Sequence, residues 1–181
     1  MLLAILFIYF HVGTTDIEVL KYYSFSPERQ SILWFALFFA FGVKIPMFPV
    51  HVWLPEAHVE APTVGSVLLA GILLKMGSYG ILRFTFQIVP YGTEDYTPIV
   101  FLFALLSIIY ASLVTIRQID LKKIIAYSSV VHMNFIVMGM FSYNIYGLGG
   151  SILSMISHGF VSSALFILVG CLYDRYRTRL V

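Results

Sequence analysis

The hydrophobic and polar positions of this chain are arranged in long blocks rather than in short amphipathic repeats. Long apolar stretches are separated by short segments that hold most of the prolines and charged side chains. A helix of about 20 apolar residues matches the thickness of bilayer hydrocarbon. The pattern therefore predicts five transmembrane helices, at residues 31–54, 63–84, 97–117, 122–141 and 149–173.

The composition supports the same fold class. Of the 181 residues, 60% are hydrophobic and only 11% are charged, whereas soluble domains carry about 25% charged residues. We expect an all-α integral membrane protein with one membrane domain over residues 1–181. The net charge of +2 gives no reason to expect a nucleic-acid partner. The only cysteine, Cys171, cannot form an internal disulfide or a cysteine metal cluster.

The first segment, residues 1–12, is apolar but too short to cross a bilayer alone. It lacks the basic flank and the small-residue cleavage site of a signal peptide. We interpret it as the stub of a truncated helix.

Lysine and arginine residues in the connections predict the orientation, because they concentrate on the cytoplasmic or matrix side. Three lie on one side and six on the other, which places the second side in the cytoplasm or matrix. The first set is Lys21, Arg29 and Arg83, and the second is Arg117, Lys122, Lys123, Arg175, Arg177 and Arg179.

Four ionisable side chains stand near the middle of predicted spans: Lys44, Lys75, His132 and His158. A charge at mid-helix costs roughly 2.5–3.5 kcal/mol on insertion scales. A chain that carries such a group on nearly every span is typical of a protein that moves charge through the membrane. The structural alternative is a lysine paired at a helix kink, or a histidine that acts only in packing.

Lys44 is followed by two prolines, Pro46 and Pro49, inside the same predicted span. Proline lacks the backbone donor of a helix, so this sequence predicts a break that frees the carbonyls of Gly42 and Ile45. A break at mid-membrane is tolerated only where it is buried in protein or lines a wet cavity. Transporters use such breaks at their ion sites.

Hydroxyl and imidazole groups accompany these ionisable residues at helical spacing. Ser128 precedes His132 by one turn, and Ser154 and Ser162 flank His158 four residues on either side. Residues four apart share a helix face, and histidine titrates near neutral pH. We predict that these groups hold waters or relay protons. The secondary proton path is predicted to be His51, Ser128, Ser154 and Ser162.

No aspartate or glutamate lies within any predicted span. A buried lysine needs a counter-charge or must lose its own, so the partner carboxylate is expected from another segment or chain. The sequence holds no dinucleotide-binding, Walker or cysteine-cluster motif, and we expect this chain to bind no cofactor or metal. Haem bound by the two mid-membrane histidines would leave both lysines unexplained.

Three long stretches and two shorter ones together carry a family resemblance. They are KIPMFPVHVWLPEAHVEAPT (residues 44–63), LLAGILLKMG (68–77), RQIDLKKIIAYSSVVHMN (117–134), SHG (157–159) and the ending LYDRYRTRL (172–180). They resemble the subunit 4 family of proton-pumping NADH:ubiquinone oxidoreductase, respiratory complex I. The HVEAP run favours subunit 4 over the related subunits 2 and 5.

This resemblance implies an antiporter-like bundle of fourteen helices with two inverted five-helix repeats. The chain would correspond to helices seven to eleven with a stub of the sixth, as a central fragment or the product of a split gene. The residues that match the family's proton path at the membrane midplane are Lys44, Lys75, His132 and His158. The glutamate that pairs with the lysine of the broken helix belongs to the absent first half.

The resemblance also implies the partners and the location. Flavin, iron–sulfur clusters and ubiquinone would belong to partner subunits, which couple NADH oxidation to proton pumping. Other membrane-arm subunits would include a chain with the missing first-half helices and a carboxylate for Lys44. The bilayer would be the mitochondrial inner membrane or, alternatively, a bacterial plasma membrane. A subunit of a multisubunit cation/proton antiporter and a non-conducting structural remnant remain alternatives.

Overall fold

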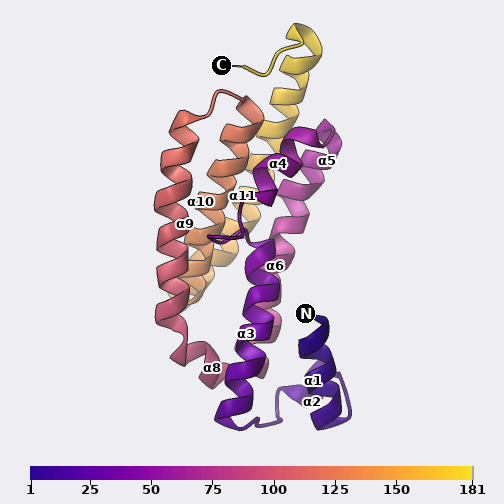
Figure 1. The fold of residues 1–181 in the computed structure, drawn as a ribbon, viewed down its shortest axis with the longest axis vertical. Coiled ribbons are helices and arrows are strands. Elements are labelled where there is room, and N and C mark those ends of the chain that lie inside the picture. The colour runs from indigo at the N-terminus through magenta and orange to yellow at the C-terminus, as the bar shows by residue number, and fades with distance from the viewer. Residues whose placement is uncertain (181) are drawn as a thin grey trace.

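The computed structural model describes residues 1–180, and this range is helical with no β-strand, as the sequence predicts. The helices form an elongated bundle (Figure 1). In chain order they are α1 (Leu2–Val12), α2 (Ile17–Leu20), α3 (Pro27–Lys44), α4 (Trp53–Glu60), α5 (Thr63–Leu68), the π-helical η1 (Leu69–Leu73), α6 (Leu74–Gly80), the π-helical η2 (Ile81–Thr85), α7 (Phe86–Ile88), α8 (Pro90–Asp95), α9 (Thr97–Arg117), α10 (Leu121–Met140) and α11 (Ile145–Tyr176).

Four helical runs in the described range are long and apolar enough to cross a membrane. Their positions follow the pattern in the sequence: two of them differ from the predicted bounds by one residue, and the other two extend three or four residues further. The longest, α11, has 32 residues, which corresponds to about 48 Å at 1.5 Å per residue. The runs are Thr63–Ile88, Thr97–Ile116, Leu121–Met140 and Ile145–Tyr176.

The sequence predicts a span over residues 31–54 that is broken at Pro46 and Pro49, and the break is confirmed. Helix α3 begins earlier, at Pro27, and ends at Lys44; residues 45–52 form turns before α4 begins at Trp53. The two prolines therefore open a gap of several residues rather than a kink, because each removes a helix donor and restricts the residue before it. The break lies midway along the bundle, between α3 and α4 (Figure 1).

Two segments expected to be connections are helical instead. Residues 55–60 belong to α4, and residues 90–95 form α8. Both helices contain proline near their start, a position where the missing N–H has no helical partner to lose. Helix α8 begins at Pro90, and Pro55 is the third residue of α4.

Helix α10 occupies the centre of the bundle, packed against α9, α11 and α4. Helix α3 packs against α6, η2 and α8, and α1 lies beside α3 (Figure 1). The core between these helices is apolar and rich in aromatic rings. Trp34 of α3 is fully buried and packs against Tyr96, the residue before α9, with ring centroids 4.8 Å apart. Because lipid provides no hydrophobic force between helices, such close packing is what holds them together.

A buried glutamine joins the start of α3 to α8. The Gln30 side-chain amide donates to the carbonyl oxygen of Phe25 at 3.1 Å. Its Oε1 accepts the backbone N–H groups of Tyr91 at 3.2 Å and Gly92 at 3.4 Å. Gln30 is only 3% exposed, so these backbone groups have little access to another partner.

We expect Gln30→Met to lower the free energy of unfolding by about 1–3 kcal/mol, because it leaves buried backbone groups without partners. Gln118→Met is the control, since the Gln118 amide donates only to the carbonyl of Val114 at the end of α9, at 3.3 Å. Thermal unfolding of the purified protein in detergent measures both. Equal melting temperatures for the two variants would contradict a bracing role for Gln30.

Candidate functional site

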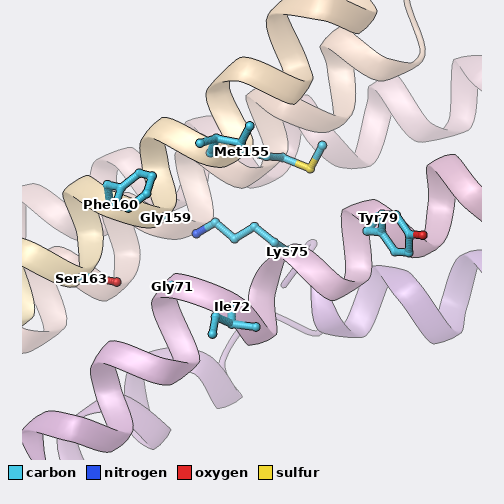
Figure 2. Close-up of a pocket in the computed structure, with 9 residues that line it drawn as sticks. Gly71, Ile72, Lys75, Tyr79, Met155, Gly159, Phe160 and Ser163 are labelled. Carbon is cyan, nitrogen blue, oxygen red and sulfur yellow. The ribbon is translucent and has the colours of Figure 1, made fainter.

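The Lys75 ammonium lies between α6 and α11, where two predicted path residues meet. Its Nζ donates to the carbonyl oxygen of Ala70 at 2.5 Å and lies 2.7 Å from Nδ1 of His158. The contact joins residues 83 positions apart in the sequence. Figure 2 shows the lysine side chain extending across to α11, beside Gly159, in a pocket of about 470 Å³.

The carbonyl that Lys75 uses belongs to the π-helical segment η1. At the end of η1 the amide of Leu74 bonds back to the carbonyl of Leu69, five residues earlier. In an α-helix it would bond to the carbonyl of Ala70, four residues earlier. The wider turn therefore leaves the Ala70 carbonyl for the lysine. π-Helical turns occur frequently at functional sites.

The two predicted histidines also come together. The rings of His132 on α10 and His158 on α11 have centroids 5.7 Å apart, at an interplanar angle of 51°. Both line a pocket of about 440 Å³ that also contains Ser154 and Ser157. A pocket of this size with several polar partners can hold ordered water. The structure thus brings together Lys75, His158, His132 and Ser154 from three different helices.

Two serines of the predicted secondary path bond to their own helices instead. The Ser162 hydroxyl donates to the carbonyl of His158 at 2.6 Å, and the Ser128 hydroxyl donates to the carbonyl of Ile125 at 2.8 Å. Ser128 thus makes no hydrogen bond to His132 within residues 1–180. The spacing of one turn is compatible with both arrangements, and in apolar surroundings a hydroxyl is readily satisfied by the carbonyl of the preceding turn.

His51 lies away from the other path residues. Its ring is buried between Phe48, with centroids 5.8 Å apart, and Tyr110 on α9, with centroids 5.1 Å apart. In an unbroken helix His51 would share a face with Lys44, seven residues earlier. It does not, because the helix ends at Lys44 and His51 belongs to the break.

Lys44 ends α3 beside the helix that carries Lys75. A Cβ placed on Gly77 of α6 would lie 3.0 Å from the Cβ of Lys44, so the two backbones approach closely there. The Lys44 side chain is exposed at the surface of the bundle. Its ammonium makes no hydrogen bond and no ion pair with any residue of the described range 1–180.

Side chains and backbone together satisfy polar groups of the break. The N–H of Met47 donates to the carbonyl of Gly42 at 3.0 Å, so the prediction that this carbonyl is free is wrong. The indole N–H of Trp53 donates to the carbonyl of Val43 at 2.9 Å. Because α4 begins at Trp53, this bond ties the second half of the broken helix to the first.

Two neighbouring helices also hold the break. Ser107 of α9 accepts the N–H of Phe48 at 2.7 Å, and Asn134 of α10 donates to the carbonyl of Pro46 at a longer 3.4 Å. Sequence reasoning did not select either residue. The available signal was a hydroxyl and an amide inside apolar spans, since a polar group there must find a partner.

The ion pairs within residues 1–180 lie outside the four apolar runs or at their edge. Glu18 contacts Lys21 at 2.8 Å and Arg83 at 3.5 Å. The hydrogen bond and charge of Lys21 hold the pKa of the exposed Glu18 below its ordinary value. Neither Lys44 nor Lys75 has a carboxylate within 4 Å in this range. Nor does the described part of the chain group three metal-ligating side chains together.

The match to known proteins covers the whole chain: residues 1–181 match the family described as NADH:quinone oxidoreductase/Mrp antiporter, transmembrane. The chain belongs to this family. It is 64% identical over 181 residues to NADH-ubiquinone oxidoreductase chain 4 of Marchantia polymorpha and of Arabidopsis thaliana. In each case the match covers 100% of this chain and 37% of the relative.

The fold matches that of a chain in a solved structure of respiratory complex I. The structure superposes on a chain of respiratory complex I from Thermus thermophilus with a TM-score of 0.93 and 29% sequence identity. The superposition covers 99% of this chain and 39% of that chain. The arrangement of the helices in this chain is therefore that of part of a chain of respiratory complex I.

If the Ser107 hydroxyl holds the break, its removal should make the backbone of the break exchange hydrogen faster. We expect Ser107→Ala to speed hydrogen exchange at the Phe48 amide by roughly tenfold or more, since an unsatisfied buried donor costs about 1–3 kcal/mol. Ser112→Ala is the matched control, because both hydroxyls donate to a carbonyl four residues earlier in α9 at 2.6 Å. Hydrogen exchange followed by mass spectrometry compares residues 45–52. Equal exchange in both variants would show that Ser107 does not hold the break.

Proposed function

We propose that this chain is a proton-translocating part of the membrane arm of an NADH:ubiquinone oxidoreductase, of the chain 4 type. The identity of 64% to two chain 4 proteins supports the assignment to that complex. NADH oxidation and ubiquinone reduction, with their flavin and iron–sulfur clusters, would take place in partner subunits. These relatives and the apolar helices make the chain a multi-pass protein of the mitochondrial inner membrane.

The observation that carries the proposal is the row formed by Lys75, His158 and His132. The Lys75 ammonium has only donors, so the 2.7 Å contact makes Nδ1 of His158 the acceptor. A neutral His158 then carries its hydrogen on Nε2, a tautomer inferred from this contact. A proton passed from Lys75 to Nδ1 would let His158 release one from Nε2. Waters in the neighbouring pocket and His132 would receive it.

Lysine suits the first position of this row for a chemical reason. An ammonium can give up a proton and later regain it, whereas a guanidinium stays charged in proteins. The Ala70 carbonyl is uncharged, and the His158 ring is uncharged when it accepts from Lys75. No fixed negative charge therefore holds the proton on the lysine. We propose that Lys75 gains a proton and passes it on during each pumping cycle.

Lys44, the last residue of α3, would add a further charged group to the row. It lacks a carboxylate partner within residues 1–180, and the chain spans 37% of the length of its chain 4 relatives. We propose that the carboxylate comes from a segment or chain that supplies the first-half helices. Its approach and withdrawal would change the charge next to Lys75.

A cation/proton antiporter is the second candidate, since the family description includes Mrp antiporters. An antiporter of this kind would transport without NADH and would depend on sodium. Purification of the chain in mild detergent, with mass spectrometry of the associated proteins, separates the candidates. Copurified flavin and iron–sulfur subunits would support the oxidoreductase, and their consistent absence from an active complex would favour the antiporter.

We expect Lys75→Met to reduce NADH-driven proton pumping at least about tenfold, because the side chain keeps its length but loses the transferable proton. Lys123→Met is the control, since Lys123 lies at the cytoplasmic or matrix end of α10 and bonds to none of the path residues. Acidification of membrane vesicles measures pumping, and mass spectrometry of the purified complex confirms assembly. Full pumping in an assembled Lys75→Met complex would make the row structural and favour the non-conducting alternative.

Lys44→Ala tests whether the lysine at the end of α3 takes part in pumping. We expect a strong loss of pumping with assembly retained, because the exposed side chain contributes charge and little packing to this part of the bundle. The ratio of protons pumped to NADH oxidised is the quantity to measure. An unchanged ratio in vesicles with a normal complex content would leave Lys44 no role beyond ending α3.

A further inference from the structure

We infer that Gly159 and Gly71 are positioning residues, whose close backbone contact sets the distance between Lys75 and His158. This inference rests on the proposed function and adds to it. The two glycines lie where α11 crosses the helical run of residues 63–88, on either side of the lysine side chain (Figure 2). Neither glycine carries a group that could transfer a proton, so both act only through the geometry of their neighbours.

The space at Gly159 is limited by backbone. A Cβ placed there would lie 3.2 Å from the carbonyl oxygen of Gly71, and 3.6 Å and 3.9 Å from Cε and Nζ of Lys75. The contact with the carbonyl is tighter than ordinary van der Waals packing. A carbonyl of a helix cannot rotate away as a side chain can, so the two helices would have to separate by a few tenths of an ångström.

The space at Gly71 is limited by a side chain. A Cβ placed there would lie 2.7 Å from the hydroxyl oxygen of Ser163, while the carbonyl oxygen of Gly159 would be at an ordinary 3.9 Å. The Ser163 hydroxyl makes one long hydrogen bond, to the carbonyl of Val67 at 3.4 Å. An added methyl group would therefore press on a backbone carbonyl at Gly159 and on a side-chain hydroxyl at Gly71.

Sequence adjacency couples this contact to the proton row. Gly71 follows Ala70, whose carbonyl accepts from Lys75, and Gly159 follows His158, whose Nδ1 contacts the same ammonium. Separating Gly71 from Gly159 would therefore move both acceptors of the lysine apart. Proton transfer needs donor and acceptor within hydrogen-bond reach, and small displacements of reacting groups have large effects on rate.

Helix α11 offers a matched control for the substitution. A Cβ placed on Gly149 would meet nothing within 4 Å. Gly149→Ala and Gly159→Ala make the same change in helix propensity in the same helix. Any difference between them reports the crossing with the run of residues 63–88.

The experiment compares NADH-driven pumping in membrane vesicles that carry the assembled complex. We expect Gly159→Ala to reduce the pumping rate roughly five- to tenfold and to shift its pH profile, with the complex content unchanged. Gly149→Ala should match the unsubstituted protein in rate and pH profile. A structural role alone would lower the complex content without shifting the pH profile of the complex that remains. Normal pumping and an unshifted profile in Gly159→Ala would overturn the inference.

A second pair of variants decides the matter where Gly159→Ala does not assemble. Gly71→Ala should reduce pumping, because its Cβ would lie 2.7 Å from the Ser163 hydroxyl, which the hydrogen bond to the Val67 carbonyl holds at the crossing. Gly71→Ala with Ser163→Ala should restore pumping, because removal of the hydroxyl leaves only the ordinary 3.9 Å contact. Ser163→Ala alone should pump normally. Unimpaired pumping in Gly71→Ala, or a failure of Ser163→Ala to restore it, would overturn the inference.

Failure of the inference differs from failure of the proposed function. Without the proposed function, either Lys75→Met would pump as fully as the unsubstituted protein, or no variant would show NADH-driven pumping. With the function intact and the inference wrong, Lys75→Met would lose pumping while Gly159→Ala and Gly71→Ala retained it.

Discussion

The interior of a bilayer offers no hydrogen bonds, so every interruption of a helix there must be satisfied by the protein itself. The break between α3 and α4 shows how this constraint organises the bundle. Trp53 bonds back across the gap, and Ser107 on α9 bonds to the backbone inside it. Helices α9 and α10 therefore do more than pack: they supply the polar atoms without which the broken helix could not lie at mid-membrane.

The second irregular helix uses the same principle for a different purpose. The π-helical turn η1 does not interrupt the helix, but it takes the Leu74 amide to the carbonyl of Leu69 instead of that of Ala70, and the Ala70 carbonyl accepts from Lys75. A backbone group thereby becomes a neutral acceptor for a charge in an apolar region. The break releases backbone groups that neighbouring helices must satisfy, whereas η1 releases one that a side chain of the same helical run uses.

The sequence predicted the fold class and singled out Lys75, His132 and His158, which the structure brings together, because both inferences depend on composition and position. A lysine or histidine within an apolar span is visible without coordinates. The extent of the break was not predictable, since the prolines do not determine where α4 resumes. The π-helical segments η1 and η2 have no distinct sequence pattern. The contact of Ser107 with the break depends on which helices pack against residues 45–52. The spacing of residues along the sequence does not show which helices those are.

The different surroundings of the two lysines fit the different roles that we propose for them. A buried carboxylate close to an ammonium stabilises the charged pair and resists proton transfer. Lys75 has instead a carbonyl and an imidazole, which support the ammonium without binding it so strongly, and the imidazole can itself take the proton. Lys44 has no such acceptors within residues 1–180, and we propose that a carboxylate from outside this range balances its charge. A partner that controls that balance would act on the row through the electric field of Lys44, across the close contact between the end of α3 and Gly77.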